Sequence, residues 1–159
     1  MTAETLSDWG EEDHTEMGKV REFHVSSSQH HAAAKYLLSA CLPNASSLMA
    51  TEVVYLGGYV IECLLKAVLF ANTRPRKHEM LEREVKFEIG HDLEKLRLRL
   101  ERLRKPIRLP IQHGRLFRLI NTQWHTNLRY EGKRMVTQEA QQFMDAVDSI
   151  VIWANEGVR

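Results

Sequence analysis

The chain has 159 residues, of which 43% are hydrophobic and 27% are charged. This length suits one domain rather than two, and the composition is typical of a soluble globular protein, which excludes collagen-like and intrinsically disordered chains. With 22 basic and 21 acidic side chains the formal net charge is only +1, and this total by itself favours no class of partner.

The charges are segregated along the sequence. Residues 1–18 contain six carboxylates and no Lys or Arg, whereas residues 95–118 contain nine cations and a single carboxylate. We therefore expect residues 1–24 to form a flexible acidic arm and residues 25–159 to form the folded domain. The near-neutral total hides two segments of opposite charge, and the basic one is typical of polyanion-binding surfaces.

Three features predict a cytoplasmic protein. Cys41 and Cys63 lie among apolar residues and outside any C-x-x-C motif, as expected for buried thiols in a reducing compartment. The N-terminus has no apolar stretch typical of a secretory signal. The longest apolar segment, residues 53–71, contains Glu62 and Lys66, which favours a buried core helix over a membrane span. We therefore expect no membrane partner.

The first two predicted helices carry many of the apolar residues. Helical spacing predicts a helix over residues 27–41, with a serine of Ser26–Ser28 as its N-cap. A second helix is predicted over residues 47–70, and because it is apolar on nearly all sides we expect it at the centre of a bundle. Gly57-Gly58 within it indicate a close helix–helix or dimer contact, or else a kink, since each glycine costs about 1 kcal/mol in a helix interior.

The middle of the chain contains one ambiguous segment and one clear helix. Residues 79–88 fit either a short helix or an irregular segment. A third helix is predicted directly after His91-Asp92, because an aspartate near a helix start is favoured by the free amides there. The spacing of four leucines supports it: Leu93, Leu96, Leu100 and Leu103.

Two further helices complete the predicted fold. Pro106 and Pro110 bracket a break, after which a fourth helix covers residues 111–124. The fifth helix starts at a Thr137 cap and ends at Gly157. No segment shows a convincing strand pattern, so we predict an all-α fold, an up-and-down antiparallel bundle of four to five helices.

Several of these segments together resemble the HEPN domain family of small helical proteins. The most specific are G-Y-x-x-E-C-x-L-K-A at residues 58–67 and G-H-D-L at residues 90–93. Residues 31–40 and the R-Y-E triplet at residues 129–131 complete a resemblance that covers residues 27–155.

The resemblance implies a bundle that forms a homodimer and acts in prokaryotic toxin–antitoxin or phage-defence systems. It implies RNA, a nucleotide, or a nucleotidyltransferase or other defence-system protein as the partner. Many members of the family are ribonucleases whose site is an Arg and a His with four to six residues between them, paired across the dimer. The subgroup that this chain resembles often lacks that motif.

Arg118 and His125 are the candidate catalytic pair, with six intervening residues. Arg108 and His113 also match the spacing, but Pro110 lies between them. A separation of seven places Arg118 and His125 on one face of a helix. There an imidazole can accept the proton of a ribose 2′-OH while a guanidinium stabilises the developing phosphate charge, without a metal ion. The alternative is a solvated arginine followed by a histidine in a loop.

Five other residues are candidates for a binding site. Glu62 and Lys66, one turn apart on the central helix, form either an intrahelical ion pair or part of a polar cleft that includes His91 or Arg129. His91 alternatively helps to cap the third helix by bonding a backbone carbonyl. Arg129 and Tyr130 either contact a ligand phosphate or fix their loop to the bundle.

The basic segment contains the candidate nucleic-acid contacts, which are Arg97, Arg99, Arg104, Arg108 and Arg115. Such a cluster can follow a phosphate backbone with an affinity that falls as salt rises, because binding releases counterions. Alternatively, it is a solvated face that the acidic arm partly neutralises. No metal-ligand spacing or phosphate-binding glycine motif is present, so we expect no metal and no cofactor.

Three functions are consistent with these patterns. The first is a HEPN-like component of a toxin–antitoxin or defence system that binds RNA, a nucleotide or a protein through its basic surface. The second is a metal-independent endoribonuclease that uses Arg118 and His125 at a dimer cleft. The third is a purely structural interaction domain whose Gly57-Gly58 surface packs against a partner.

Overall fold

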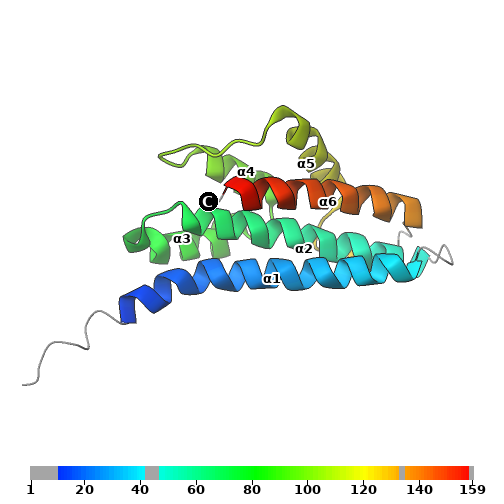
Figure 1. Cartoon of the computed structure of the whole chain (residues 1–159), viewed down its shortest axis with the longest axis horizontal. Helices are drawn as coiled ribbons and strands as arrows, with labels where there is room; N and C mark the ends of the chain where they lie inside the picture. Colours follow the sequence, from blue (N-terminus) through cyan, green and yellow to red (C-terminus); the bar gives the residue numbers. More distant parts are fainter. Residues whose placement is uncertain (1–10, 42–46, 133–134, 158–159) are drawn as a thin grey trace, which may run out of the picture.

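The described part of the chain is helical, which confirms the all-α prediction. The structure, a computed structural model, describes residues 11–41, 47–132 and 135–157. These residues form six α-helices and no strand (Figure 1). The helices are α1 (Glu11–Cys41), α2 (Ser47–Ala71), α3 (His78–Glu84), α4 (Leu93–Glu101), α5 (Ile111–Gln123) and α6 (Thr137–Gly157). Their number exceeds the predicted four to five because the ambiguous segment contains a helix of its own, α3.

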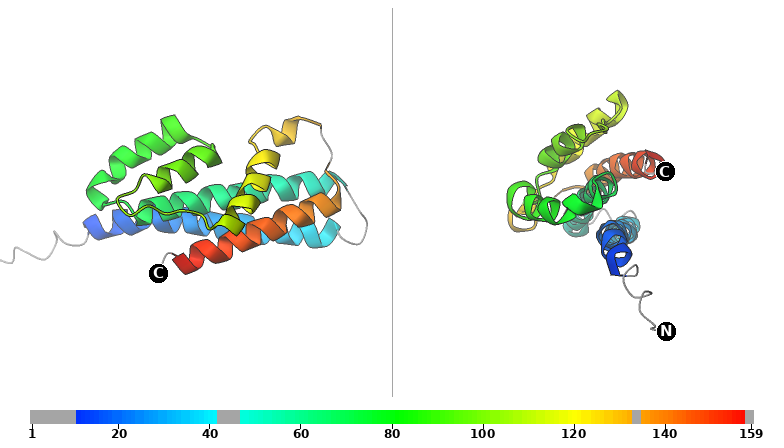
Figure 2. Two further views of the ribbon diagram at one scale, coloured as in Figure 1. Left: turned by 90° about the horizontal axis from the view of Figure 1, so that it is seen from above. Right: turned by 90° about the vertical axis from the view of Figure 1, so that its left-hand side faces the viewer.

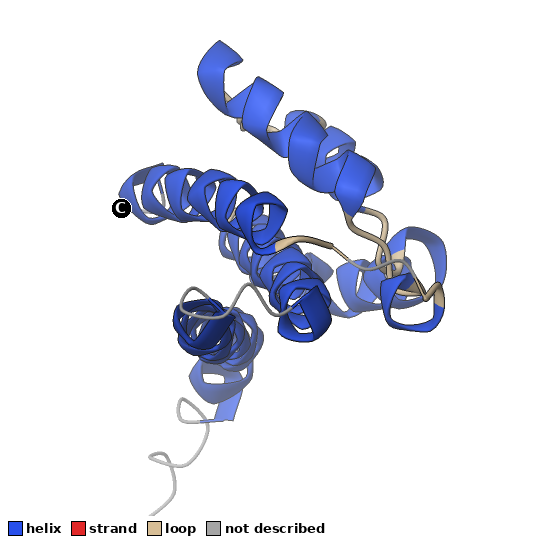
Figure 3. Cartoon of the chain, turned by 90° about the vertical axis from the view of Figure 1, so that its right-hand side faces the viewer, coloured by secondary structure: helices blue, strands red, loops and turns tan. Residues whose placement is uncertain are grey.

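The three long helices α1, α2 and α6 pack side by side, while α4 packs on α2 and α5 packs on α6 (Figures 1 and 3). α2 and α6 run in the same direction, and α1 runs opposite to both (Figure 1). The strictly up-and-down antiparallel prediction is therefore wrong for the α2–α6 pair. The reason is that the shorter helices carry the chain back to the end at which α2 began before α6 starts (Figure 2).

α2 is the central helix, as its sequence predicted. Every residue from 60 to 70 is buried, including the charged Glu62 and Lys66. Among the described residues, Met49–Ala71 is the one helical segment that is long and apolar enough to cross a membrane. Its most apolar window has a mean hydropathy of 1.8 but is 83% buried inside the protein, as expected for a core helix.

α1 begins at Glu11, whereas the sequence predicted a start near residue 27 with a flexible arm before it. Apolar packing continues N-terminal of the serines, because Phe23 is partly buried and its ring centroid lies 5.6 Å from that of Phe70. The backbone of residues 11–24 is therefore helical. Residues 1–10 of the expected acidic arm lie outside the described residues.

Ser26–Ser28 explain the wrong helix start, because they resemble an N-cap but lie in the middle of α1. Ser27 Oγ donates to the Val60 carbonyl oxygen of α2 at 2.9 Å, and Ser28 Oγ donates to the His24 carbonyl oxygen one turn earlier at 3.0 Å. A hydroxyl within a helix can satisfy its hydrogen bond in this way. The buried Ser27 thus joins α1 to α2.

The segment between α3 and α4 forms a tight connection. α3 continues into a π-helical turn, Val85–Ile89, which ends at Gly90 with a φ of 59°. Glycine adopts this φ without the steric cost that a Cβ brings. Asp92 Oδ1 then accepts from Lys95 N at 2.9 Å, so Asp92 is the N-cap of α4, near the position that the sequence predicted.

The Gly57-Gly58 pair permits a close contact within the chain. A Cβ at Gly58 would lie 2.0–2.1 Å from atoms of the Trp124 indole, and one at Gly57 would lie 2.9 Å from Met144 and Phe143. The predicted close helix–helix contact is confirmed. The hypothesis of a purely structural domain requires the Gly57-Gly58 surface to pack against a partner. That surface is not free to do so, because side chains of the same molecule cover both glycines.

Gly58→Ala tests this packing. We expect the variant to lose about 3 kcal/mol of unfolding free energy, because the indole of Trp124 must move and overpacked cores lose stability. Urea unfolding followed by circular dichroism measures the change.

Gly114→Ala is the matched control. Gly114 lies inside α5 with no atom near the position of an added Cβ, so we expect a gain of about 1 kcal/mol from helix propensity. If Gly58→Ala were as stable as the natural chain, the tight Gly58–Trp124 contact would be wrong.

Candidate functional site

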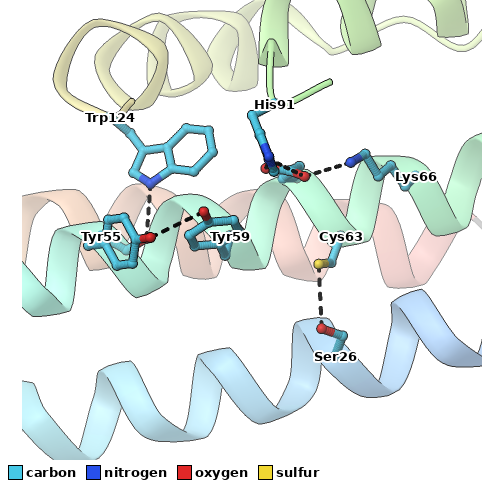
Figure 4. Close-up of polar contacts among 8 residues, drawn as sticks. Ser26, Tyr55, Tyr59, Cys63, Lys66, His91 and Trp124 are labelled. Carbon is cyan, nitrogen blue, oxygen red and sulfur yellow. Dashed lines mark hydrogen bonds and ion pairs between the residues drawn. The ribbon is translucent and has the colours of Figure 1, made fainter. Parts of the chain in front are cut away.

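Glu62, Lys66 and His91 form one polar cluster between α2 and the turn before α4 (Figure 4). Lys66 Nζ donates to Glu62 Oε1 at 2.6 Å, and His91 Nδ1 lies 3.0 and 2.9 Å from the two oxygens of the same carboxylate. The Glu62 side chain is only 4% exposed, whereas that of His91 is 57% exposed. The charged pair is therefore the intrahelical ion pair of the first sequence alternative, and its carboxylate also meets His91.

A group of aromatic rings lies beside this cluster. The ring of Tyr59 makes edge contacts with Tyr55, His91 and Trp124, with centroids 5.0, 6.0 and 5.3 Å apart. Burial, together with the 3.2 Å contact between the Tyr55 and Tyr59 hydroxyls, raises the pKa of Tyr59. Trp124 Nε1 donates to the Tyr55 carbonyl oxygen at 2.9 Å. The Glu62 carboxylate beside them is almost completely buried, and burial strengthens its hydrogen bonds.

The geometry of His91 differs from the prediction that it bonds a backbone carbonyl. Its Nδ1 faces the Glu62 carboxylate instead, and Asp92 provides the cap of α4. Because a carboxylate only accepts hydrogen bonds, Nδ1 carries the proton toward Glu62. The cluster thus fixes the start of α4 on α2 while leaving the imidazole partly in solvent.

The two cysteines are free and buried, as predicted. Cys63 Sγ lies 3.6 Å from Ser26 Oγ of α1, within the range of a sulfur hydrogen bond (Figure 4). Burial raises the pKa of both thiols, which disfavours the nucleophilic thiolate. Neither cysteine therefore resembles a reactive nucleophile.

Arg129 and Tyr130 lie apart from this cluster, in the short 3₁₀ turn η3 (Leu128–Tyr130). The Arg129 guanidinium lies 4.9 Å from the centroid of the Tyr55 ring, and its Nε donates to Glu52 at 3.4 Å. Arg129 therefore fixes its loop to α2, as one of the two sequence alternatives proposed. The Tyr130 side chain is 83% exposed.

The helix that should align Arg118 with His125 ends too early. α5 stops at Gln123, and Trp124 has an extended backbone with φ −108° and ψ 133°. His125 Nε2 lies 3.3 Å from a Glu131 carboxylate oxygen instead. The prediction that Arg118 and His125 share one helix face is therefore wrong, because packing of Trp124 against α2 ends the helix before the histidine.

The predicted nucleic-acid contacts fall into three groups. Arg97 bonds the carboxylates of Glu94 and Glu101 on its own helix and lowers the pKa of Glu94, so its charge is already compensated. Arg108 is exposed in the loop before α5, and Arg115 lies on the outer face of α5. The remaining two, Arg99 and Arg104, line a common hollow.

This hollow, the basic groove, has a volume of about 530 Å³ and lies where the ends of α2 and α4 meet. It is lined by six cations and three uncharged residues: Arg74, Lys77, Arg99, Arg102, Arg104, Lys105, Asn72, Thr73 and Leu103. Apart from Arg99, none of these cations makes a side-chain hydrogen bond or ion pair with another described residue. Such a concentration of uncompensated charge favours an anionic ligand.

About half of the residues that line this groove were not predicted from the sequence. Arg74 and Lys77 come from the basic connection after α2, well before the basic segment of residues 95–118, and only the fold brings the two together. Pro75, the first residue of the 3₁₀ turn η1 (Pro75–Lys77), restricts the backbone between them. The cluster R-P-R-K in that connection was the signal available in the sequence.

The C-terminus of α2, which would repel an anion, is capped by side chains. Asn72 Nδ2 donates to the Val68 carbonyl oxygen and Thr73 Oγ1 to that of Leu69, both at 2.8 Å. His78 Nε2 lies 3.0 Å from two more carbonyl oxygens, those of Phe70 and Thr73. Engaged carbonyls weaken the negative end of the helix dipole, so the cations dominate the groove.

Within the part of the chain that the structure describes, no group of three or more His, Cys, Asp or Glu residues could hold a metal ion. The chemistry that the described residues can offer is therefore of two kinds. The basic groove offers a concentration of cations, and His91 offers an imidazole that is partly exposed to solvent.

Lys66→Met tests the buried charge pair. Removal of one partner leaves the Glu62 carboxylate without its cation in a nearly dry site, so we expect a loss of about 3–5 kcal/mol of unfolding free energy. The double variant Glu62→Gln with Lys66→Met removes both charges and should lose less than the single variant. Urea unfolding measures both.

Lys35→Met provides the control, because Lys35 pairs with Asp148 at a side chain that is 55% exposed. An exposed pair contributes about 0–1 kcal/mol. Equal losses for Lys66→Met and Lys35→Met would contradict a special role for the buried pair.

Comparison with known proteins identifies no relative of this chain. No family model, curated protein or solved structure matches it.

Proposed function

We propose that this helical protein binds RNA through its basic groove. One observation carries the proposal: five of the six cations in the groove have no partner among the described residues, and no carboxylate lines it. Elsewhere in the described structure, Lys19, Arg83 and Arg97 are paired with carboxylates. An uncompensated basic concavity is the arrangement that phosphate groups stabilise.

The physical basis is the release of counterions from the RNA. Each phosphate that a lysine or arginine neutralises on a single strand lowers the slope of log affinity against log salt by about 0.7. Cationic side chains without a carboxylate partner can neutralise phosphates without first breaking an ion pair. By contrast, Arg97 would first have to break its bonds to Glu94 and Glu101.

The wider setting of this function remains a prediction from the sequence. In that setting the chain is a HEPN-like component of a prokaryotic toxin–antitoxin or phage-defence system, located in the cytoplasm. A homodimer, and a nucleotidyltransferase or other defence-system protein as partner, belong to the same prediction. The basic groove would then be the part of the component that holds RNA.

A ribonuclease activity is the weaker alternative. It relied on Arg118 and His125 lying on one helix face, and α5 ends at Gln123. His125 also faces Glu131 in its own loop. RNA binding without cleavage is therefore the function that the geometry favours.

Charge reversal in the groove tests the proposal. We expect Arg102→Glu combined with Arg104→Glu to weaken binding of a fluorescent single-stranded oligouridine at least tenfold at low salt. The steepness of log affinity against log salt should fall by about 0.7 for each phosphate that the variant no longer neutralises. Fluorescence anisotropy over a salt series measures both quantities.

The matched control is Arg108→Glu with Arg115→Glu, which changes the net charge equally but lies outside the groove. We expect this control to bind RNA nearly as well as the natural chain. Equal weakening in both variants would show a diffuse basic face rather than a groove site. Cleavage of the probe that survives EDTA and disappears in His125→Ala would instead favour the ribonuclease.

A further inference from the structure

The basic groove is small for the charge that it carries. Its volume of about 530 Å³ is that of a small-molecule site, for which about 300–1,000 Å³ is usual. Six cations line this volume. A hollow of this size surrounds only a short part of an RNA strand at a time, so few phosphates of a strand can lie among all six cations.

The density of negative charge therefore decides which phosphate fits best. A diester phosphate inside a strand carries one negative charge, whereas a terminal phosphate approaches two at neutral pH because its second pKa is about 6. A terminal triphosphate brings about four negative charges into the space of one or two diesters. It can offset the mutual repulsion of the cations, which a single diester cannot.

Arg99 gives the groove a positioned binding group. Its Nε donates to Glu84 Oε1 at 2.6 Å, and Glu84 itself does not line the groove. This bond fixes the guanidinium while both terminal nitrogens stay available, and a guanidinium donates to two phosphate oxygens in parallel. On the other side, Pro75 restricts the backbone that carries Arg74 and Lys77.

From this geometry we propose that the basic groove recognises a terminal oligophosphate, the 5′-triphosphate of an RNA or of a free nucleotide, in preference to internal diester phosphates. The proposal rests on the proposed function and names the chemical group that the groove selects. Arg99 binds phosphate oxygens, and Glu84 is a positioning residue.

Two single-stranded RNAs of one sequence, one with a 5′-triphosphate and one with a 5′-hydroxyl, test the proposal by competition against the labelled oligouridine without divalent cations. We expect the triphosphate RNA to bind at least tenfold more tightly. The groove variant Arg102→Glu with Arg104→Glu should lose this preference, whereas Arg108→Glu with Arg115→Glu should keep it. Circular dichroism verifies that both variants are folded.

Free nucleoside triphosphate and inorganic triphosphate identify the source of the ligand. Displacement of the labelled oligouridine by either compound supports the proposal. Whichever of the free nucleotide and the triphosphate RNA competes at the lower concentration is the better ligand. Equal affinity for triphosphate and hydroxyl RNA, with both abolished in the groove variant, would overturn this inference but leave the proposed function intact. Absence of binding to every RNA and triphosphate would contradict both.

Glu84→Gln separates positioning from simple charge attraction. The variant keeps all six groove cations, so its affinity for hydroxyl RNA should not fall. Because Arg99 loses its charged anchor, we expect the preference for triphosphate to fall several-fold. An unchanged preference would show that Glu84 does not position Arg99 for the ligand.

Discussion

The burial of α2 on nearly all of its sides is the constraint on which the rest of the fold depends. A helix that is apolar all round must be covered all round, because exposed apolar surface costs free energy in proportion to its area. α1 and α6 cover two of its sides, and the turn before α4 together with Trp124 covers a third. The glycine at position 58 makes the last contact possible, since no side chain separates the indole from the helix backbone.

The same burial explains the polar cluster. A glutamate and a lysine placed on a core helix need partners within the protein, because an unpaired charge in a dry site is strongly destabilising. Glu62 and Lys66 are partners of each other, and His91 forms a second contact with the Glu62 carboxylate. In this way a requirement of the core determines where the chain turns from α3 into α4.

The basic groove is a consequence of where these helices end. α2 must stop once its apolar sequence is exhausted, and the connection that follows is rich in arginine and lysine. α4 is held on α2 by its leucines and by the His91 contact, so its arginine-rich end lies beside that connection. Apolar packing thus brings like charges together, at an electrostatic cost that a bound phosphate group can offset.

Part of this structure could be predicted from the sequence alone. Apolar periodicity predicted an all-α fold and the central place of α2, and the proline breaks and the Asp92 cap were visible as local signals. The start of α1 was not, because Ser27 and Ser28 satisfy their hydroxyls within and between helices as readily as at a cap. Nor was the end of α5, since contact of Trp124 with α2, a long-range interaction, removes His125 from the helix. Only the tertiary structure could join Glu62 with His91, or Arg74 and Lys77 with the end of α4, because residues far apart in sequence meet only through packing of the core between them. The basic segment therefore predicted an anionic ligand, and the fold decided which of its cations lack a carboxylate partner.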